Sequence, residues 1–331
     1  MTVKARVFSS GYWSPVATAT YVVGAVPAAA GNLVISEIMY NPAPPAGAEL
    51  AVATSASDFE YLEFLNISAN TLDLANVRMT NGVLFNFSSA DPIAQSLPPG
   101  KRLVVCANRA AFQARYGTLA EGEIAGAFTD SLNNGGEVLT LVDNNGGVIT
   151  SFAYGDSEPW PIDADGSGYS IVLNSPYAQP PTNPALGSNW RSSAAKNGSP
   201  ARGDSLPFTL DPNGDSDGDG LPNLLEYAIG SDPLVASSVA VLSAGIQEFT
   251  VSGSAAPYVT FSYRRNLLAD SIVFEVKTSA QLSDWTTSAQ DLIYVGTHNN
   301  GNGTATVILR TATPVNQATS HALFARLVVH Q

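Results

Sequence analysis

Cysteine is almost absent from this sequence, and Cys106 is the only one among its 331 residues. A single thiol cannot form an intramolecular disulfide, and it cannot supply the several ligands of a cysteine-bound zinc or iron–sulfur site. Histidine is confined to His298, His321 and His330, so residues 1–297 contain no imidazole. This excludes a Ser-His-Asp or Cys-His catalytic device within that stretch, and a histidine-ligated zinc site as well.

Basic residues are scarce. The chain holds 15 Lys and Arg against 28 Asp and Glu, which gives a net charge of −13 at pH 7 with neutral histidines. Nucleic-acid binding begins with a basic surface that neutralises phosphates, so we expect no nucleic-acid partner. Walker A loops, dinucleotide-binding glycine fingerprints and HExxH motifs are also missing from the sequence.

Long apolar runs are missing as well. The longest weakly polar run, from Ala19 to Gly31, is short and contains Pro27, so we expect no membrane span. The start, residues 1–7, lacks the apolar stretch of a signal peptide. If the chain is exported, we expect its signal to lie outside this sequence.

What the sequence does contain suits a turn-rich β protein. Hydrophobic residues make up 45% and charged residues 13%, which is enough apolar material for packed cores. Glycine (28) and proline (21) are plentiful and separate short apolar segments. The expected strands before residue 180 are 33–40, 59–65, 72–74, 83–87, 102–106, 138–142 and 168–173, with one helix at 109–116. Many short strands with turns between them predict a β-sandwich.

The motifs between residues 33 and 170 form an ordered series. They are Leu33-Val-Ile-Ser-Glu-Ile-Met-Tyr-Asn-Pro42, Glu60-Tyr-Leu-Glu-Phe64, Leu97-Pro-Pro-Gly100, Ser131-Leu-Asn-Asn-Gly-Gly-Glu137, Trp160-Pro161 and Asp165-Gly-Ser-Gly-Tyr-Ser170. This series resembles the lamin tail domain over residues 32–202. The resemblance implies an Ig-like β-sandwich with a binding or scaffolding role, in a family found in nuclear lamins and in large secreted or surface proteins of bacteria. The small-residue insertion at 43–57 is expected to form a surface loop.

Residues 1–23 alternate in the manner of two strands joined by a turn. The run Val3-Lys-Ala-Arg-Val-Phe8, with the residues that follow it to Tyr21, resembles the end of the small Ig-like domain at the C-terminus of chitobiase-type glycosidases. That resemblance implies that Met1 begins inside a domain. The alternative is an N-terminal hairpin that packs onto the next domain, followed by a linker at 24–31.

An acidic segment, 203–236, follows the predicted sandwich. Within it, side chains with oxygen donors occupy positions 1, 3, 5, 9 and 12 of a twelve-residue loop: Asp215, Asp217, Asp219, Asn223 and Glu226. Calcium prefers hard oxygen ligands, and a glycine at position 6, here Gly220, permits the sharp turn of such a loop. Leu221 at position 7 would supply its backbone carbonyl, and Glu226 both carboxylate oxygens. The pattern therefore predicts a Ca²⁺ site.

The loop leads into a short expected helix, 223–229, that ends at Gly230. Pro207 and Pro212 exclude a helix before the loop, so the segment resembles a dockerin or thrombospondin type-3 calcium repeat more than a paired sensor hand. The alternative is an acidic linker with Asx turns, but carboxylates this close repel one another without a cation. We expect the ion to order the segment and to fix the angle between two β domains.

A second small β domain is predicted over residues 237–331. Its expected strands are 249–251, 259–263, 272–276, 292–295, 305–309 and 323–329. Pieces such as Tyr263-Arg-Arg265 and Phe274-Glu-Val-Lys-Thr-Ser279 resemble the C-terminal β domains that end many exported bacterial proteins. The predicted fold is therefore all-β, with an Ig-like lamin tail sandwich linked by a calcium loop to a second, smaller β-sandwich.

No further group of residues predicts catalysis. Glu60 and Glu63 are expected on opposite faces of one strand, so they cannot act as a joint acid and base. Cys106 lies in an apolar run and is expected in the core rather than as a nucleophile. We therefore expect that the chain is not an enzyme.

The expected function is a non-catalytic, calcium-stabilised binding or scaffolding module of an exported or cell-surface multidomain bacterial protein. Its partner besides calcium would be an extracellular polysaccharide or a surface protein. The alternative is that these units are accessory domains of an extracellular enzyme whose catalytic domain lies upstream of Met1. The codons upstream of Met1 would discriminate between the two hypotheses.

Overall fold

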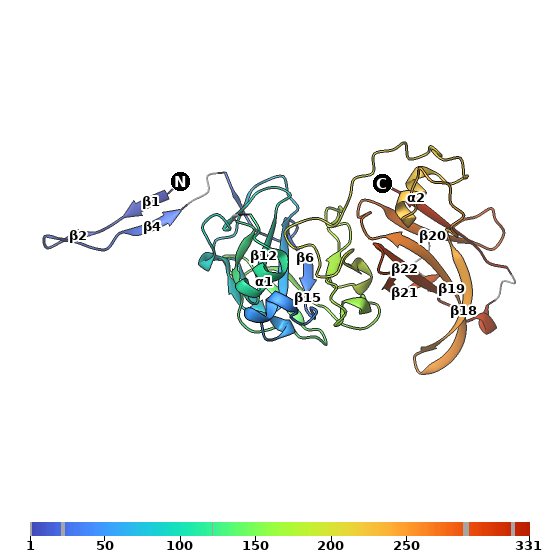
Figure 1. Ribbon diagram of the computed structural model, residues 1–331, viewed down its shortest axis with the longest axis horizontal. Coiled ribbons are helices and arrows are strands. Elements are labelled where there is room, and N and C mark those ends of the chain that lie inside the picture. The colour runs from blue at the N-terminus through green and yellow to red at the C-terminus, as the bar shows by residue number, and fades with distance from the viewer. Residues whose placement is uncertain (1, 21–23, 121, 287–290, 319–321) are drawn as a thin grey trace. The chain divides into compact units, whose positions relative to one another are not determined.

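The computed structural model describes residues 2–20, 24–120, 122–286, 291–318 and 322–331 (Figure 1). Strands hold 36% of the residues and helices 11%, so the predicted all-β class is confirmed. The chain divides into two compact units. Unit 1 comprises residues 1–38, 44–133 and 137–153, and unit 2 comprises residues 39–43, 134–136 and 154–331.

The first residues of unit 1 form a hairpin. β1 (Thr2–Ala5) pairs with β4 (Ala17–Thr20), and β2 (Phe8–Ser9) pairs with β3 (Tyr12–Trp13), both antiparallel. The two strands predicted within residues 1–23 are therefore present, although residues 21–23 lie outside the described part of the chain. The rings of Phe8 and Trp13 lie 4.6 Å apart between centroids, and both side chains are exposed.

Small sheets form the rest of unit 1. One contains β13 (Ile124–Ala127), β12 (Arg102–Cys106), β7 (Tyr61–Asn66) and β6 (Leu33–Met39), in that order. Another contains β10 (Phe85–Asn86), β9 (Arg78–Asn81), β14 (Val138–Val142) and β15 (Val148–Ala153), and a 3₁₀ helix, η3 (Phe87–Ser89), follows β10. A further sheet contains the two-residue strands β11 (Ser96–Leu97), β8 (Leu72–Asp73) and β5 (Val26–Pro27), in that order. Every residue of β7 is buried, so this strand lies in the core.

The helix α1 (Arg109–Tyr116) has the predicted bounds. The side-chain oxygen of Asn108 accepts the N–H groups of Ala110 at 3.0 Å and Ala111 at 3.2 Å, which are donors without a partner inside the helix. The helix ends at Gly117, where φ is +77°. Both ends of α1 are therefore determined by the neighbouring residues of the chain.

The insertion before β7 is more ordered than the surface loop expected there. It forms two 3₁₀ helices, η1 (Gly47–Ala51) and η2 (Ala56–Phe59). Arg115 of α1 pairs with Glu49 at 2.9 Å, and its guanidinium lies 3.3 Å from the ring centroid of Phe59. An ion pair and a cation–π contact thus hold the insertion against α1.

Unit 2 contains the sheets and helices of the C-terminal half. The larger sheet has the order β18 (Ser243–Val251), β19 (Ser254–Asn266), β22 (Thr304–Thr311) and β21 (Leu292–Asn299). β20 (Val273–Ser279) pairs with β23 (Phe324–His330), and β16 (Ile171–Leu173) pairs with β17 (Trp190–Ser192), both antiparallel. The helices of unit 2 are η4 (Ile162–Ala164), η5 (Gly187–Asn189), α2 (Asn223–Ile229) and η6 (Val315–Gln317).

Five strands of unit 2, β18 to β22, are longer than the sequence predicts. β18 begins at Ser243 rather than Phe249, and β19 runs from Ser254 to Asn266. The predicted domain boundaries at residues 202 and 236 stay predictions. Within the described ranges, no helix has the length and apolar character needed to cross a membrane.

Candidate metal site

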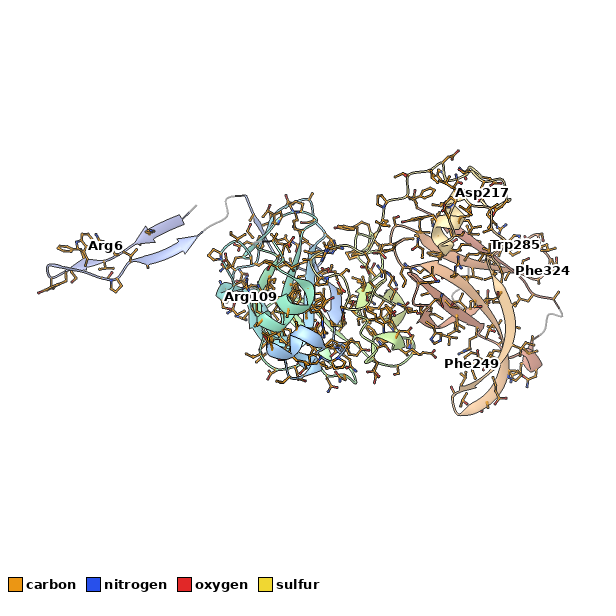
Figure 2. The ribbon with its side chains drawn as sticks, viewed as in Figure 1. Arg6, Arg109, Asp217, Phe249, Trp285 and Phe324 are labelled. Carbon is orange, nitrogen blue, oxygen red and sulfur yellow. The ribbon has the colours of Figure 1, made fainter. Side chains whose placement is uncertain are left out.

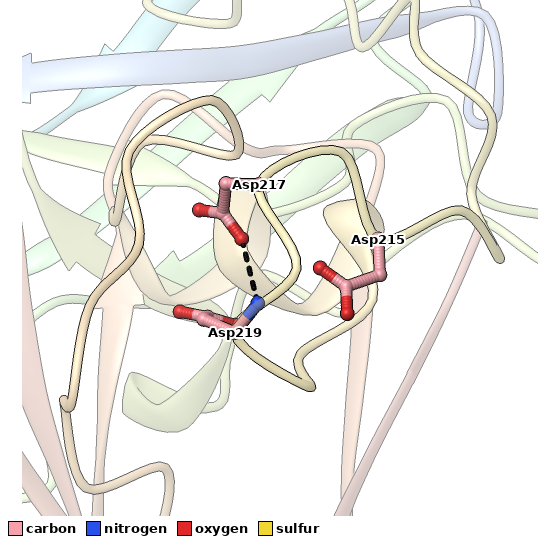
Figure 3. A group of neighbouring side chains, drawn as sticks. All are labelled: Asp215, Asp217 and Asp219. Carbon is pink, nitrogen blue, oxygen red and sulfur yellow. Dashed lines mark hydrogen bonds between the residues drawn. The ribbon is translucent and has the colours of Figure 1, made fainter.

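The acidic loop brings three of its aspartates together in unit 2. One carboxylate oxygen from each of Asp215, Asp217 and Asp219 lies within 4.8 Å of the other two (Figure 3). The sequence predicted this grouping from the spacing of the residues. Three carboxylates at this distance repel one another, so the arrangement favours a cation.

Hydrogen bonds inside the loop hold the aspartates in place. Asp215 accepts the N–H of Gly218 at 2.8 Å through Oδ1 and the N–H of Gly220 at 3.0 Å through Oδ2. Oδ1 of Asp217 accepts the N–H of Asp219 at 3.1 Å (Figure 3). Gly218 and Gly220 have φ of +81° and +96°, a backbone conformation that glycine adopts without strain. The loop backbone therefore curls around its own carboxylates.

Glu226, at the end of the predicted loop, is buried without a partner. It lies in α2 and has no exposed surface, and neither of its carboxylate oxygens has a hydrogen-bond partner. Oδ2 of Asp217 is likewise buried and unpartnered. A buried carboxylate with no partner is costly, so these three oxygens are chemically suited to bind a cation.

The electrostatic environment of Glu226 agrees with this reading. Burial, followed by the negative charges of Asp217, Asp219 and Asp215, raises the pKa of Glu226 to about 6. Each of these effects disfavours the charged carboxylate. A divalent cation at the loop would reverse them by favouring the ionised form.

The side chain of Asn223 makes two hydrogen bonds that connect parts of the acidic segment. Its Oδ1 accepts the N–H of Ser216 at 3.0 Å, and its Nδ2 donates to the carbonyl of Asp211 at 2.9 Å. The side chain is therefore buried as a brace across the loop. That Asn223 and the carbonyl of Leu221 are metal ligands stays a prediction.

One contact of the loop was not predicted. Oδ2 of Asp219 accepts the N–H of Ser237 at 2.8 Å, while its Oδ1 accepts the N–H of Leu221 at 2.9 Å. Ser237 lies outside the twelve-residue pattern, and no local sequence signal indicates the contact. The hydrogen bond from Ser237 connects the segment that follows α2 to the acidic loop.

The helix α2 has its predicted bounds, and β19 holds its C-terminal end. Arg264 donates from Nε to the carbonyl of Ile229 at 2.7 Å and from Nη2 to that of Gly230 at 3.1 Å. Asn266 donates to the carbonyl of Tyr227 at 2.9 Å. Arg264 thus satisfies two carbonyls at the C-terminal end of the helix. Asn266 adds a second donor to the carbonyl of Tyr227, which also accepts the N–H of Gly230 at 3.2 Å. At Gly230, φ is +71° and a Cβ atom would lie 2.6 Å from Thr304, so glycine is required there.

Apolar contacts hold the rest of α2 against unit 2. Leu224 and Ala228 pack in one buried cluster with Ala269 and Ile272. The hydroxyl of Tyr227 donates to the carbonyls of Leu206 and Leu268, the latter at 3.1 Å. The helix that carries Glu226 is therefore part of the core of unit 2.

The other carboxylates considered in the sequence have structural partners. Glu60 accepts the N–H of Leu132 at 2.7 Å, and burial raises its pKa to about 8. Glu63 accepts the hydroxyl of Ser36 at 2.6 Å and Nε of Arg102 at 2.9 Å. Each glutamate therefore has its own hydrogen-bond partners, and that the two do not act as a joint acid and base stays a prediction.

Comparison with known families bears on unit 1. Residues 26–156 match the family model of the lamin tail domain. The predicted lamin tail resemblance is confirmed for this segment, and with it the Ig-like fold, although the match ends before residue 202. No curated protein and no solved structure matches the chain. The resemblances to chitobiase-type domains and to dockerin or thrombospondin repeats stay predictions.

Proposed function

We propose that this chain is a non-catalytic, calcium-stabilised binding or scaffolding module of an exported or cell-surface protein. The observation that carries the proposal is the buried, unpartnered carboxylate of Glu226 beside the aspartate group of the loop. The lamin tail match supports the scaffolding part, because that domain is an Ig-like fold consistent with a non-catalytic module.

Calcium fits the donors of the loop better than other common metals. The candidate ligands are carboxylate, amide and carbonyl oxygens, and soft metals prefer thiolate or imidazole. Magnesium requires near-ideal octahedral geometry and keeps several waters, whereas calcium accepts many oxygens in flexible geometry. A loop of Asx turns with glycines provides such flexible geometry.

The proposed role of the ion is to stabilise unit 2. A bound cation would neutralise the repulsion among Asp215, Asp217, Asp219 and Glu226, and would so favour the position of α2 in the core. An ion that binds the folded state stabilises it according to its concentration and dissociation constant. Weak calcium sites of extracellular modules suit the calcium-rich surroundings of an exported protein.

The binding or scaffolding part of the proposed function is assigned to the lamin tail segment, residues 26–156. An extracellular polysaccharide or a surface protein is the partner that we propose for it. With no histidine before His298 and no carboxylate pair expected on one strand face, we expect no hydrolase activity from the purified chain. Saturable turnover that depends on one residue of the lamin tail segment would contradict this part of the proposal.

Titration calorimetry with thermal unfolding tests the calcium site. We expect measurable heat on adding calcium to the whole chain and a rise in melting temperature at millimolar calcium. Glu226→Gln should weaken both effects, since it removes a charge from the buried carboxylate. Glu275→Gln is a matched control, because Glu275 lies in β20, pairs with Lys277 at 3.2 Å and is no part of the acidic loop. If millimolar calcium gives no heat and no change in melting temperature, the loop is an acidic linker and the proposed calcium site is wrong.

A further inference from the structure

β18 forms an open edge of the larger sheet in unit 2. Its nine residues pair with β19 on one side. On the other side, no strand among the described residues pairs with it (Figure 1). Residues 243–248 are all exposed, and Ile246 keeps 67% of its surface in solvent. An open edge of this length presents a row of backbone donors and acceptors to another strand.

The turn after β18 determines which backbone groups face that edge. Ser252 and Gly253 form a two-residue loop with φ of +51° and +81°, and Val251 pairs with Ser254 across it. Residues that flank such a loop hydrogen-bond to each other, so the odd-numbered residues of β18 direct their backbone groups to β19. The even-numbered residues direct theirs to the open edge: Ala244, Ile246, Glu248 and Thr250.

The far end of the β18–β19 hairpin lacks a third strand. β22 pairs with β19 only from Thr260 to Asn266, so residues 254–259 have no described partner strand on that side. Pro257 lies opposite Glu248, whose backbone groups point to the open edge, so the nitrogen of Pro257 points to the other side of β19. Proline has no N–H, so this residue cannot donate a hydrogen bond to a further strand on that side. A two-stranded ribbon is only marginally stable in water. The open edge of β18, which contains no proline, is therefore the side on which the ribbon can gain a strand.

We propose that β18 is an interface between two copies of this chain, which pair antiparallel through this strand about a two-fold axis. The register that matches all nine residues places Gln247 opposite the partner's Gln247. Ile246 then lies opposite the partner's Glu248, and Ala244 lies opposite the partner's Thr250. All of these flanking residues have outward-facing backbone groups. Such an interface uses the same surface on both copies and joins the two larger sheets into one.

The side chains of β18 suit this register. Glu248 is the only charged residue of the strand, and it faces Ile246 rather than a second carboxylate. Figure 2 labels Phe249 of β18, whose ring lies 5.9 Å from that of Tyr258. In this register Phe249 is opposite the partner's Gly245, where no side chain obstructs it. Natural sheets block their edges with charged side chains, especially lysine, with proline or with bulges. β18 has no lysine, proline or register shift, and its one charge, Glu248, lies opposite Ile246 in this register. A second copy is therefore a suitable occupant of this edge.

Sedimentation equilibrium of the whole chain tests the interface. We expect a concentration-dependent species of twice 34.4 kDa, which is 68.8 kDa. Ile246→Pro should abolish it, because the substitution removes an outward N–H without removing a hydrogen bond to β19. Leu50→Lys is a control for changes at an exposed apolar residue, since Leu50 lies in unit 1 and is 63% exposed, and it should leave the dimer intact. A monomer at every concentration, or a dimer that Ile246→Pro leaves intact, would overturn the proposal.

Cysteine cross-linking tests the register independently of the proline variant. In Gln247→Cys the two new thiols face each other in a non-hydrogen-bonded pair, with Cα atoms about 4.5 Å apart, which a disulfide can span. In Ser243→Cys the two thiols lie eight residues apart along the strand, or about 27 Å. We expect oxidation to give a covalent dimer of Gln247→Cys and none of Ser243→Cys. Equal cross-linking of both variants, or of neither, would contradict the register.

Discussion

Arg191 and Asp270 form a two-point ion pair across a long stretch of unit 2. Nε of Arg191 donates to Oδ1 of Asp270 at 2.9 Å, and Nη2 donates to Oδ2 at 3.0 Å. Nη1 also reaches Asp204 at 3.1 Å, at the start of the segment predicted as an acidic repeat. Burial alone would lower the pKa of Arg191, but the two carboxylates outweigh burial and raise it. The guanidinium is therefore a buried cation that depends on these partners.

The first prediction concerns this ion pair. Asp270→Ala leaves Arg191, which is 1% exposed, with one carboxylate fewer in a buried site. Removing one partner of a buried pair typically destabilises a protein by about 3–5 kcal/mol. Urea unfolding should show a loss of this size. For comparison, Lys277→Met breaks the more exposed pair with Glu275 and should cost about 1 kcal/mol or less. Equal losses in the two variants would contradict the prediction.

The second prediction is a dependence of stability on pH from Glu60. Its pKa of about 8 in the folded chain lies above the ordinary glutamate value of 4.5, mainly because of burial. Between these values the folded state keeps a proton that the unfolded state has released, so stability falls as pH rises across this window. Below about pH 4.5 the contribution is fully present, and above about pH 8 it is lost.

Glu60→Gln removes this titration while keeping an oxygen that can accept the N–H of Leu132. The free energy of unfolding of the variant, relative to the wild type, should therefore increase from about pH 5 to about pH 8. Urea unfolding at a series of pH values measures the difference. A difference that stays constant over this range would show that Glu60 does not hold its proton in the folded chain.

The third prediction concerns the thiol of Cys106. Burial raises its pKa to about 12, and its Sγ lies 3.6 Å from the carbonyl of Gly126. Because thiolate is the reactive form, the native chain should not be labelled by iodoacetamide near pH 8. In concentrated guanidinium, one thiol per chain should react. Stoichiometric labelling of the native chain would contradict a core position for Cys106.

The features that the sequence predicts best depend on neighbouring residues. Both helices have their predicted bounds, because Asn108 and Gly117 delimit α1, and Gly230 ends α2. The aspartates of the acidic loop come together as their spacing predicts, since Asx turns with the following N–H groups form within a few residues. The lamin tail resemblance depends on an ordered series of such local motifs.

The features that the sequence does not predict depend on distant residues. The start of β18 was missed because Ser243 to Glu248 includes Gly245 and little apolar alternation, and pairing with β19 outweighs that weak propensity. Asp219 accepts the N–H of Ser237, and Asn223 donates to the carbonyl of Asp211. Both contacts join residues at least twelve positions apart, so they depend on the folded path of the chain and not on a local pattern. The partners of Arg191 have no local signal, because Asp270 lies far along the chain.

The last prediction couples the packing of α2 to calcium. Leu224 lies on α2 in the buried cluster with Ala269 and Ile272, and the same helix carries Glu226. Leu224→Ala should lower the stability of unit 2 by about 2–5 kcal/mol, as truncation of a buried leucine typically does. It should also weaken calcium binding in titration calorimetry, because a less firmly packed α2 holds Glu226 less well against the loop. Leu234→Ala is the control, since Leu234 follows the same helix but is 66% exposed, and it should change neither quantity. If Leu224→Ala destabilises the chain while calcium affinity stays at the wild-type value, the loop positions Glu226 without help from the core, and the proposed coupling between metal and helix is wrong.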